Sequence, residues 1–287
     1  MAHPLVFDRA LLRRRQVRAR ALGAETFLID RVASDLADRL GAVLRDFALA
    51  VDLGTPSGAV RTALAGVSPI GRLFRVAPSP DADVIADEEA LPFRDGSLDL
   101  VISALALQFV NDLPGALIQI RRALKPDGLL LAALLGGDTL TELRQSFAAA
   151  EAEIEGGVSP HVAPFADVRD LGALLQRAGF ALPVTDVERL TVRYSSPFLL
   201  MGELRRMGAT NVLVERRRKP LRRGTLKRMA EIYAERFSDP DGRVRATFEI
   251  IWVSGWAPHE SQPKPLRPGS AQARLADALG TKETKLP

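Results

Sequence analysis

The sequence predicts an α/β protein built on a doubly wound, mostly parallel sheet. Short apolar strings, such as Val101–Leu107 and Leu129–Leu135, alternate with longer segments whose apolar residues recur at helical spacing. This alternation is typical of parallel strands joined by crossover helices. With 287 residues, 47% of them apolar, the chain is long enough to bury one sizeable core.

Composition excludes several classes of function. The chain has no cysteine and three histidines, which excludes disulfides and cysteine-ligated metal centres and predicts no metal site. No apolar run reaches the roughly 18 residues of a membrane-spanning helix, and no secretion signal is recognisable. We therefore expect a cytoplasmic protein.

The first 46 residues are expected to form helices ahead of the sheet. Apolar positions stand among arginines over 7–21, and Leu28, Val32, Leu36 and Leu40 then follow four residues apart. That spacing places them on one face of a helix.

The alternating pattern occupies the middle of the chain. Strands are predicted at 47–53, 72–77, 82–87, 98–107, 129–135, 184–194 and 246–257, with helices at 59–66, 112–124, 139–154, 168–180 and within about 197–237. Residues 125–128, Lys-Pro-Asp-Gly, are predicted to form a turn. The expected organisation is a helical extension at 1–46, a sheet domain at 47–262 and an extended or disordered tail at 263–287.

The first strand runs into the loop Asp52-Leu53-Gly54-Thr55-Pro56-Ser57-Gly58. In doubly wound sheets the first strand-to-helix loop usually contacts the ligand. Gly54 and Gly58 lack a Cβ and so permit close approach, whereas Pro56 has no N–H to offer. An ordinary tight turn explains the same residues equally well.

Position strengthens the ligand interpretation. The loop resembles the D-L-G-C-G-T-G motif of the class I S-adenosylmethionine (SAM) methyltransferases, and the later stretches ADEEALPFRDGSLDLV and LPGALIQIRRALKPDGLLL resemble that family's following motifs. The resemblance implies a seven-stranded Rossmann-like sheet with an antiparallel last strand, and a helical insertion at about 197–237. It also implies cofactor contacts from five residues, Asp52, Gly54, Gly58, Asp87 and Glu88.

A narrower resemblance covers roughly residues 5–272. The stretches FDRALLRRR, ALLGGDTLTELRQSF, EGGVSPHVAPF and GWAPHESQPKPLRPGSA are similar to the mitochondrial complex I assembly factors with a methyltransferase fold and their alphaproteobacterial relatives. This resemblance implies modification of a protein client, an arginine of the complex I iron–sulfur subunit, and leaves methylation and hydroxylation both open. It also implies peripheral contact with the inner face of the inner membrane.

The cofactor positions depart from the methyltransferase pattern. The central loop glycine is Pro56, and the acid that binds the ribose hydroxyls is Ala77. Nine residues separate Ala77 from Asp87, fewer than a parallel crossover normally needs. A lost ribose clamp weakens binding by roughly 3–6 kcal/mol gross. SAM binding and a non-catalytic assembly chaperone that lost it therefore both stay open.

Two further features carry alternative interpretations. His161, flanked by prolines, is a candidate base or substrate-orienting residue, or else a loop histidine that satisfies local backbone groups. Basic residues gather between Arg216 and Arg228 without an intervening acid, which suits either an anionic membrane or a solvated surface. No nucleic-acid partner is expected.

Overall fold

The computed structural model describes residues 5–66, 70–263 and residue 280, so nearly all of the tail predicted at 263–287 lies outside the described residues. The seven strands form one sheet in the order β3-β2-β1-β4-β5-β7-β6. The strands are β1 (Phe47–Leu53), β2 (Ile70–Ala77), β3 (Val84–Ile85), β4 (Leu98–Ala104), β5 (Leu124–Leu135), β6 (Ala181–Tyr194) and β7 (Val244–Trp256).

Strand direction follows the predicted fold. Strands β1 to β5 pair in parallel, and β7 runs antiparallel to both of its neighbours, β5 and β6. The predicted seven-stranded, doubly wound sheet with an antiparallel last strand is confirmed.

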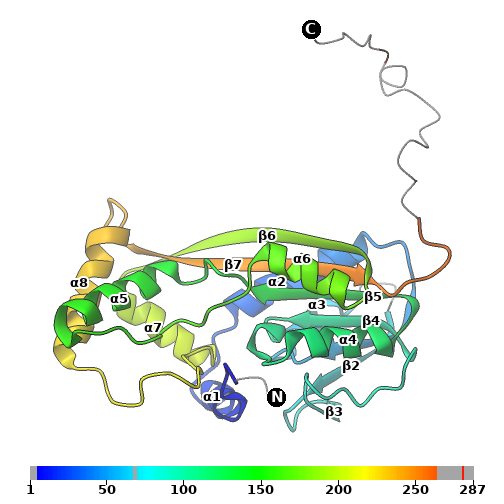
Figure 1. Cartoon of the computed structure of the whole chain (residues 1–287), viewed down its shortest axis with the longest axis horizontal. Helices are drawn as coiled ribbons and strands as arrows, with labels where there is room; N and C mark the ends of the chain where they lie inside the picture. The colour runs from blue at the N-terminus through cyan, green and yellow to red at the C-terminus, as the bar shows by residue number, and fades with distance from the viewer. Residues whose placement is uncertain (1–4, 67–69, 264–279, 281–287) are drawn as a thin grey trace.

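Helices cover both faces of the sheet (Figure 1). They are α1 (Arg9–Ala21), α2 (Phe27–Gly41), α3 (Ala59–Ala63), α4 (Leu113–Ala123), α5 (Thr141–Glu155), α6 (Val168–Arg177), α7 (Pro197–Arg206) and α8 (Arg223–Phe237). One buried cluster joins α2, α5 and α8 to one face, and a second joins α4 and α6 to the other. Alternate residues of each parallel strand face the two layers, so the buried parts of these strands are mostly apolar on both faces.

Several helices lie together at one end of the molecule. Figure 1 shows α5, α7 and α8 together at the left, with α1 below the sheet. Helix α1 begins at Asp8, whose carboxylate accepts a hydrogen bond from the Leu11 N–H at 2.9 Å, an N-cap. Only Leu12 and Ala19 of this helix are buried, so polar side chains supply most of its attachment.

Of two connections considered in the sequence analysis, residues 125–128 differ from the prediction and the β2–β3 connection agrees with it. Residues 125–128 do not form a turn: they belong to β5, where the β4 pairing shifts register and Asp127 adopts a φ of 64°, as in a β-bulge. Only six residues, 78–83, join β2 to β3, and they contain no helix. The two strands still pair, but over two residues each.

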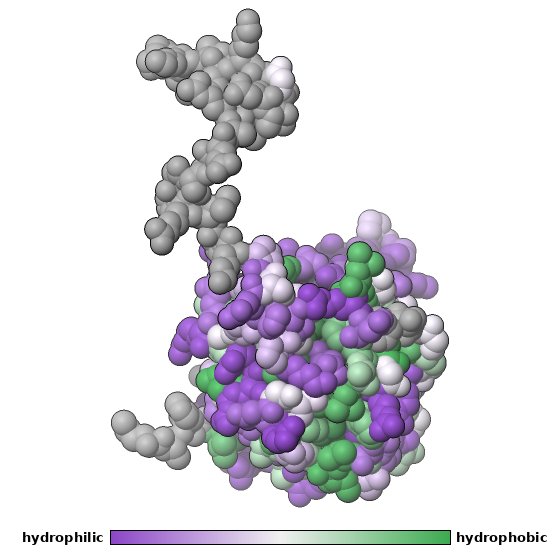
Figure 2. Space-filling view, turned by 90° about the vertical axis from the view of Figure 1, so that its right-hand side faces the viewer, coloured by the Kyte–Doolittle hydropathy of each residue, from purple (hydrophilic) through white to green (hydrophobic). Residues whose placement is uncertain are grey.

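The surface carries both hydrophilic and hydrophobic areas. Figure 2 shows a face with hydrophilic residues over most of its area and hydrophobic residues gathered below. No helix among the described residues is long and apolar enough to cross a membrane.

Candidate functional site

A buried carboxylate lies at the end of β1, next to the loop predicted to bind the cofactor. Asp52 is fully buried, its Oδ1 accepts a hydrogen bond from the Thr55 hydroxyl, and its Oδ2 has no partner. Burial raises the pKa of Asp52 to about 7, against the lowering effect of the Thr55 hydrogen bond. Thr55 Oγ1 in turn accepts the Ala104 N–H of β4 at 3.1 Å. The loop is thereby fastened to its neighbouring strand.

The two predicted cofactor glycines have different surroundings. Gly54 has a φ of +74°, and a Cβ there would lie 2.7 Å from Glu88 Oε1; its N–H donates to the Val76 carbonyl at 2.7 Å. Gly58 is the N-cap of α3 at a φ of −81°, with open space around its Cβ position. Close approach therefore requires glycine at position 54, whereas position 58 is free of that constraint.

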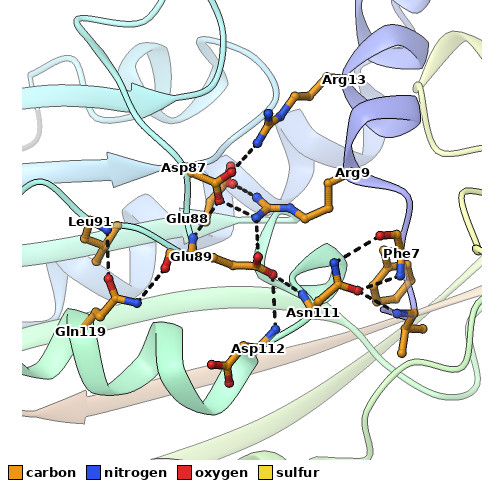
Figure 3. Close-up of polar contacts among 11 residues, drawn as sticks. Phe7, Arg9, Arg13, Asp87, Glu88, Glu89, Leu91, Asn111, Asp112 and Gln119 are labelled. Carbon is orange, nitrogen blue, oxygen red and sulfur yellow. Dashed lines mark hydrogen bonds and ion pairs between the residues drawn. The ribbon is translucent and has the colours of Figure 1, made fainter. Parts of the chain in front are cut away.

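Two arginines of α1 reach the predicted cofactor carboxylates (Figure 3). Arg9 forms ion pairs with Asp87 and Glu88 and a third with Glu89 at 3.1 Å, and Arg13 pairs with Asp87. The Arg9 side chain is only 13% exposed, so water screens these pairs weakly.

The neighbouring carboxylates respond differently to this environment. Burial raises the pKa of Glu88 above its ordinary value despite the attraction of Arg9. Burial acts in the same direction on Asp87, but the Glu89 N–H and the Arg9 guanidinium together hold the pKa of Asp87 below its ordinary value.

The same network fastens the start of the chain over the cleft. Glu89 accepts the backbone N–H of Asn111, whose Oδ1 accepts the N–H groups of Val6 and Phe7 at 2.9 and 2.8 Å. Figure 3 shows these residues as one continuous chain of contacts. The loop after β3, the start of α4 and the N-terminal segment are therefore held as a unit.

The space beside Gly54 and Glu88 does not fit SAM as the side chains are arranged. Gly54, Pro56, Ala77 and Glu88 line a cavity of about 30 Å³, room for roughly two water molecules. The buried Arg75 side chain lies beneath it and donates to the Thr55 carbonyl at 3.1 Å and to Asp81 at 2.8 Å. Ala77 offers no acceptor for a ribose, and Arg9 occupies the carboxylates expected beside an adenine.

His161 lies away from this cleft, on the wall of a larger cavity between the sheet and the helices at 197–237. Its Nε2 is 2.9 Å from Glu151 Oε1, and its ring stacks on Phe147 at 4.0 Å with an interplanar angle of 11°. Glu151 is 1% exposed and also lies 3.6 Å from Arg217. Burial favours a higher pKa for Glu151, but the hydrogen bonds from His161 and Ser159 lower it below its ordinary value.

The basic segment 216–228 is partly neutralised by acids that lie far from it in the sequence. Arg217 pairs with Glu155 at 3.1 Å, and Arg228 pairs with Glu153 at 2.6 Å. Arg216 pairs with Asp8 at 3.3 Å. Five cations of the segment stay exposed, namely Arg218, Lys219, Arg222, Arg223 and Lys227.

Comparison with known proteins gives the family. The family described as "Methyltransferase domain" matches residues 51–132. The Danio rerio protein named "Arginine-hydroxylase NDUFAF5, mitochondrial" is 40% identical over 95% of this chain and 89% of its own length. This chain belongs to the NDUFAF5 family. The Homo sapiens protein of the same name is 41% identical over 95% of this chain and 83% of its own length.

Solved structures agree on the fold. The Bacillus halodurans protein BH2331 superposes with a TM-score of 0.52 at 18% identity, covering 79% of this chain and 99% of its own. The NDUFAF5 family member described here is thus an α/β protein of the methyltransferase fold.

For this NDUFAF5 family member, tertiary packing brings together Asp52, Gly54, Asp87 and Glu88 and leaves Gly58 and His161 apart. Sequence reasoning missed Arg9, Arg75 and Glu151. The stretch FDRALLRRR resembles the assembly-factor family, but no local feature of the sequence indicates which of its arginines points into the cleft. Among the described residues, no three His, Asp or Glu side chains converge as a metal site would require.

Proposed function

We propose that the protein acts on an arginine of a protein client during the assembly of respiratory complex I. The observation that supports this is the likeness to the arginine-hydroxylase NDUFAF5 relatives over 95% of the chain. A shared fold alone does not imply a shared function. Here, however, the likeness extends beyond residues 51–132, the part matched by the general methyltransferase domain, to the N-terminal helices and the segment at 197–237.

The client we propose is the complex I iron–sulfur subunit, and the location is the cytoplasm, peripherally at the inner face of the inner membrane. The relatives are named mitochondrial, which is compatible with a respiratory role. The exposed cations of the segment 218–227 support a salt-sensitive contact with an anionic surface.

The cofactor of this activity is a separate matter. The fold family usually binds SAM, and Asp52, Gly54 and Glu88 are the residues that we propose for contact with it. Arg9, Pro56 and Ala77 do not suit that cofactor as the cleft is arranged. We therefore derive no chemical step through SAM.

A second candidate function is that of an assembly chaperone without chemistry. It is favoured by one observation: the chain's own Arg9 fills the carboxylate pocket and leaves about 30 Å³ in the cleft. Such a protein would hold its client through surfaces that the cofactor does not touch.

One experiment separates the two. The tagged protein is expressed in a host that lacks its own copy, captured under native conditions, and the arginines of co-purifying proteins are examined by mass spectrometry. An arginine that carries an added oxygen only when the protein is present supports modification. Capture of the same client with unmodified arginines supports the chaperone. Absence of any complex I subunit from the captured proteins contradicts both.

A further inference from the structure

A larger hollow beside the cofactor cleft lies between the sheet and helices α5 and α7, and Phe109 lines both spaces. Its volume is about 230 Å³, and its lining includes Phe109, Phe147, Phe165 and Phe248 among aliphatic side chains. Protein interiors contain few voids larger than a water molecule, and a cavity of about 150 Å³ lined by Leu, Ile and Phe binds benzene. This hollow therefore has room for one substituted aromatic ring.

The apolar wall carries an oriented polar group. His161 lines the hollow, stacked on Phe147, with Nε2 2.9 Å from Glu151 Oε1. Glu151 also accepts the N–H and the hydroxyl of Ser159, at 2.6 and 2.7 Å, as an ionised carboxylate does.

The Glu151 carboxylate determines the tautomer of the histidine. Because a carboxylate only accepts, a neutral imidazole in this position carries its hydrogen on Nε2 and keeps a lone pair on Nδ1. In the part of the chain that the structure describes, no residue donates to that Nδ1. The dyad thus offers a hydrogen-bond acceptor in a mostly apolar hollow, whose other polar lining residues are Thr139, Arg205, Thr210 and Asn211.

We propose that the hollow is a binding site for a monocyclic phenol-type ligand, with its ring among the phenylalanines and its hydroxyl donating to His161 Nδ1. A purely apolar cavity disfavours a phenol, because a buried hydroxyl without a partner lowers affinity by about tenfold or more. An acceptor held in place by Glu151 removes that penalty. The site requires neither the client nor SAM, so it stands independently of the proposed function.

Phenol and toluene form the matched probe pair, because a methyl group replaces the hydroxyl on the same ring. Their dissociation constants for the full chain are measured by ligand-observed NMR titration at neutral pH. We expect phenol to bind at least as tightly as toluene. Binding of neither probe, or phenol binding ten times more weakly than toluene, would overturn the proposal.

Three variants locate the contact. His161→Phe keeps the stacked ring and removes the acceptor. The affinity for phenol should therefore fall about tenfold or more, while the affinity for toluene changes less than about threefold. His259→Phe, at an exposed histidine outside the hollow, should change neither. Leu143→Trp fills the hollow and should abolish both. If circular dichroism shows that His161→Phe is unfolded, His161→Met replaces it. If Leu143→Trp is unfolded, Ala163→Leu replaces it. An equal loss of both probes in the folded acceptor variant would contradict the assignment of His161.

Discussion

The guanidinium of Arg9 forms an ion pair with Glu88 across 79 residues of sequence, inside the cleft where the methyltransferase fold holds its cofactor. The same guanidinium also pairs with Asp87 and Glu89. A nucleoside that used these carboxylates would have to displace Arg9. Helix α1 therefore acts as a competitor for the site that it covers.

Restoring the family residues should increase SAM affinity, and removing Arg9 should increase it further. Ala77→Asp with Pro56→Gly supplies a ribose acceptor and a bare backbone, worth about 1.5–3 kcal/mol for each hydrogen bond to the acid. Adding Arg9→Met frees Asp87 and Glu88. Calorimetry with SAM should therefore show stepwise tightening by about tenfold or more.

The matched control for that experiment is Arg14→Met, an exposed arginine of the same helix. It should leave SAM affinity unchanged in the Ala77→Asp, Pro56→Gly background. A folded triple variant that binds no better than the parent would show that these positions do not face a cofactor.

Substitution of the loop glycines by alanine should lower the free energy of unfolding at position 54 much more than at position 58. Gly54→Ala places a Cβ 2.7 Å from Glu88 Oε1 at a φ of +74°, which should lower the free energy of unfolding by about 2–3 kcal/mol. Gly58→Ala meets open space at a φ of −81° and should change it by less than about 0.5 kcal/mol. Urea denaturation measures both, and equal losses would refute the distinction.

Ionisation of Asp52 should make the fold less stable as pH rises. Its pKa is raised by burial to about 7 in the folded protein, from about 3.9 in an unfolded chain. The stabilisation is therefore complete below about pH 4 and is lost as pH rises through 7, at about 1.4 kcal/mol for each pKa unit.

Asp52→Asn should remove this part of the pH dependence. Compared at pH 5 and pH 8 by urea denaturation, the wild type should lose more stability at pH 8 than the variant, by up to a few kcal/mol. Asp46→Asn, at an exposed carboxylate, should keep the wild-type slope. Parallel slopes for the wild type and Asp52→Asn would mean that Asp52 ionises at its ordinary pKa.

Anionic vesicles should bind the exposed cations of the basic segment. Each such residue near the surface contributes about 1 kcal/mol, and near half-molar salt the Debye length falls to about 4 Å, which should release the protein. Arg218, Lys219 and Arg223 changed together to Gln should abolish sedimentation with anionic vesicles. Neutral vesicles that bind equally well would contradict an electrostatic contact.

The choice of those three positions comes from the structure. Arg216 and Arg217 are contained in the same basic run, but both pair with acids and are mostly covered. Arg217→Gln should therefore reduce stability and leave vesicle binding intact. This variant separates a structural arginine from the surface cations around it.

The sequence by itself determined the type of sheet, with its antiparallel last strand, through its family motifs, and the loop that follows β1. Both depend on signals that lie within a few residues of each other: apolar runs of strand length, helical spacing, and the Asp52–Gly58 stretch. Its errors were local as well. Lys-Pro-Asp-Gly has the composition of a turn, yet pairing of the flanking Leu124 and Leu129 with β4 keeps it within β5 as a bulge.

Only the tertiary structure decided how the cleft and the hollow are filled. Arg9 and Glu88 are 79 residues apart, and Arg217 and Glu155 are 62 apart, so no periodicity links them. The sequence around His161 likewise did not indicate that Glu151 would orient its ring. An ion pair forms where packing places two charges in low-dielectric surroundings, and that placement depends on the whole fold.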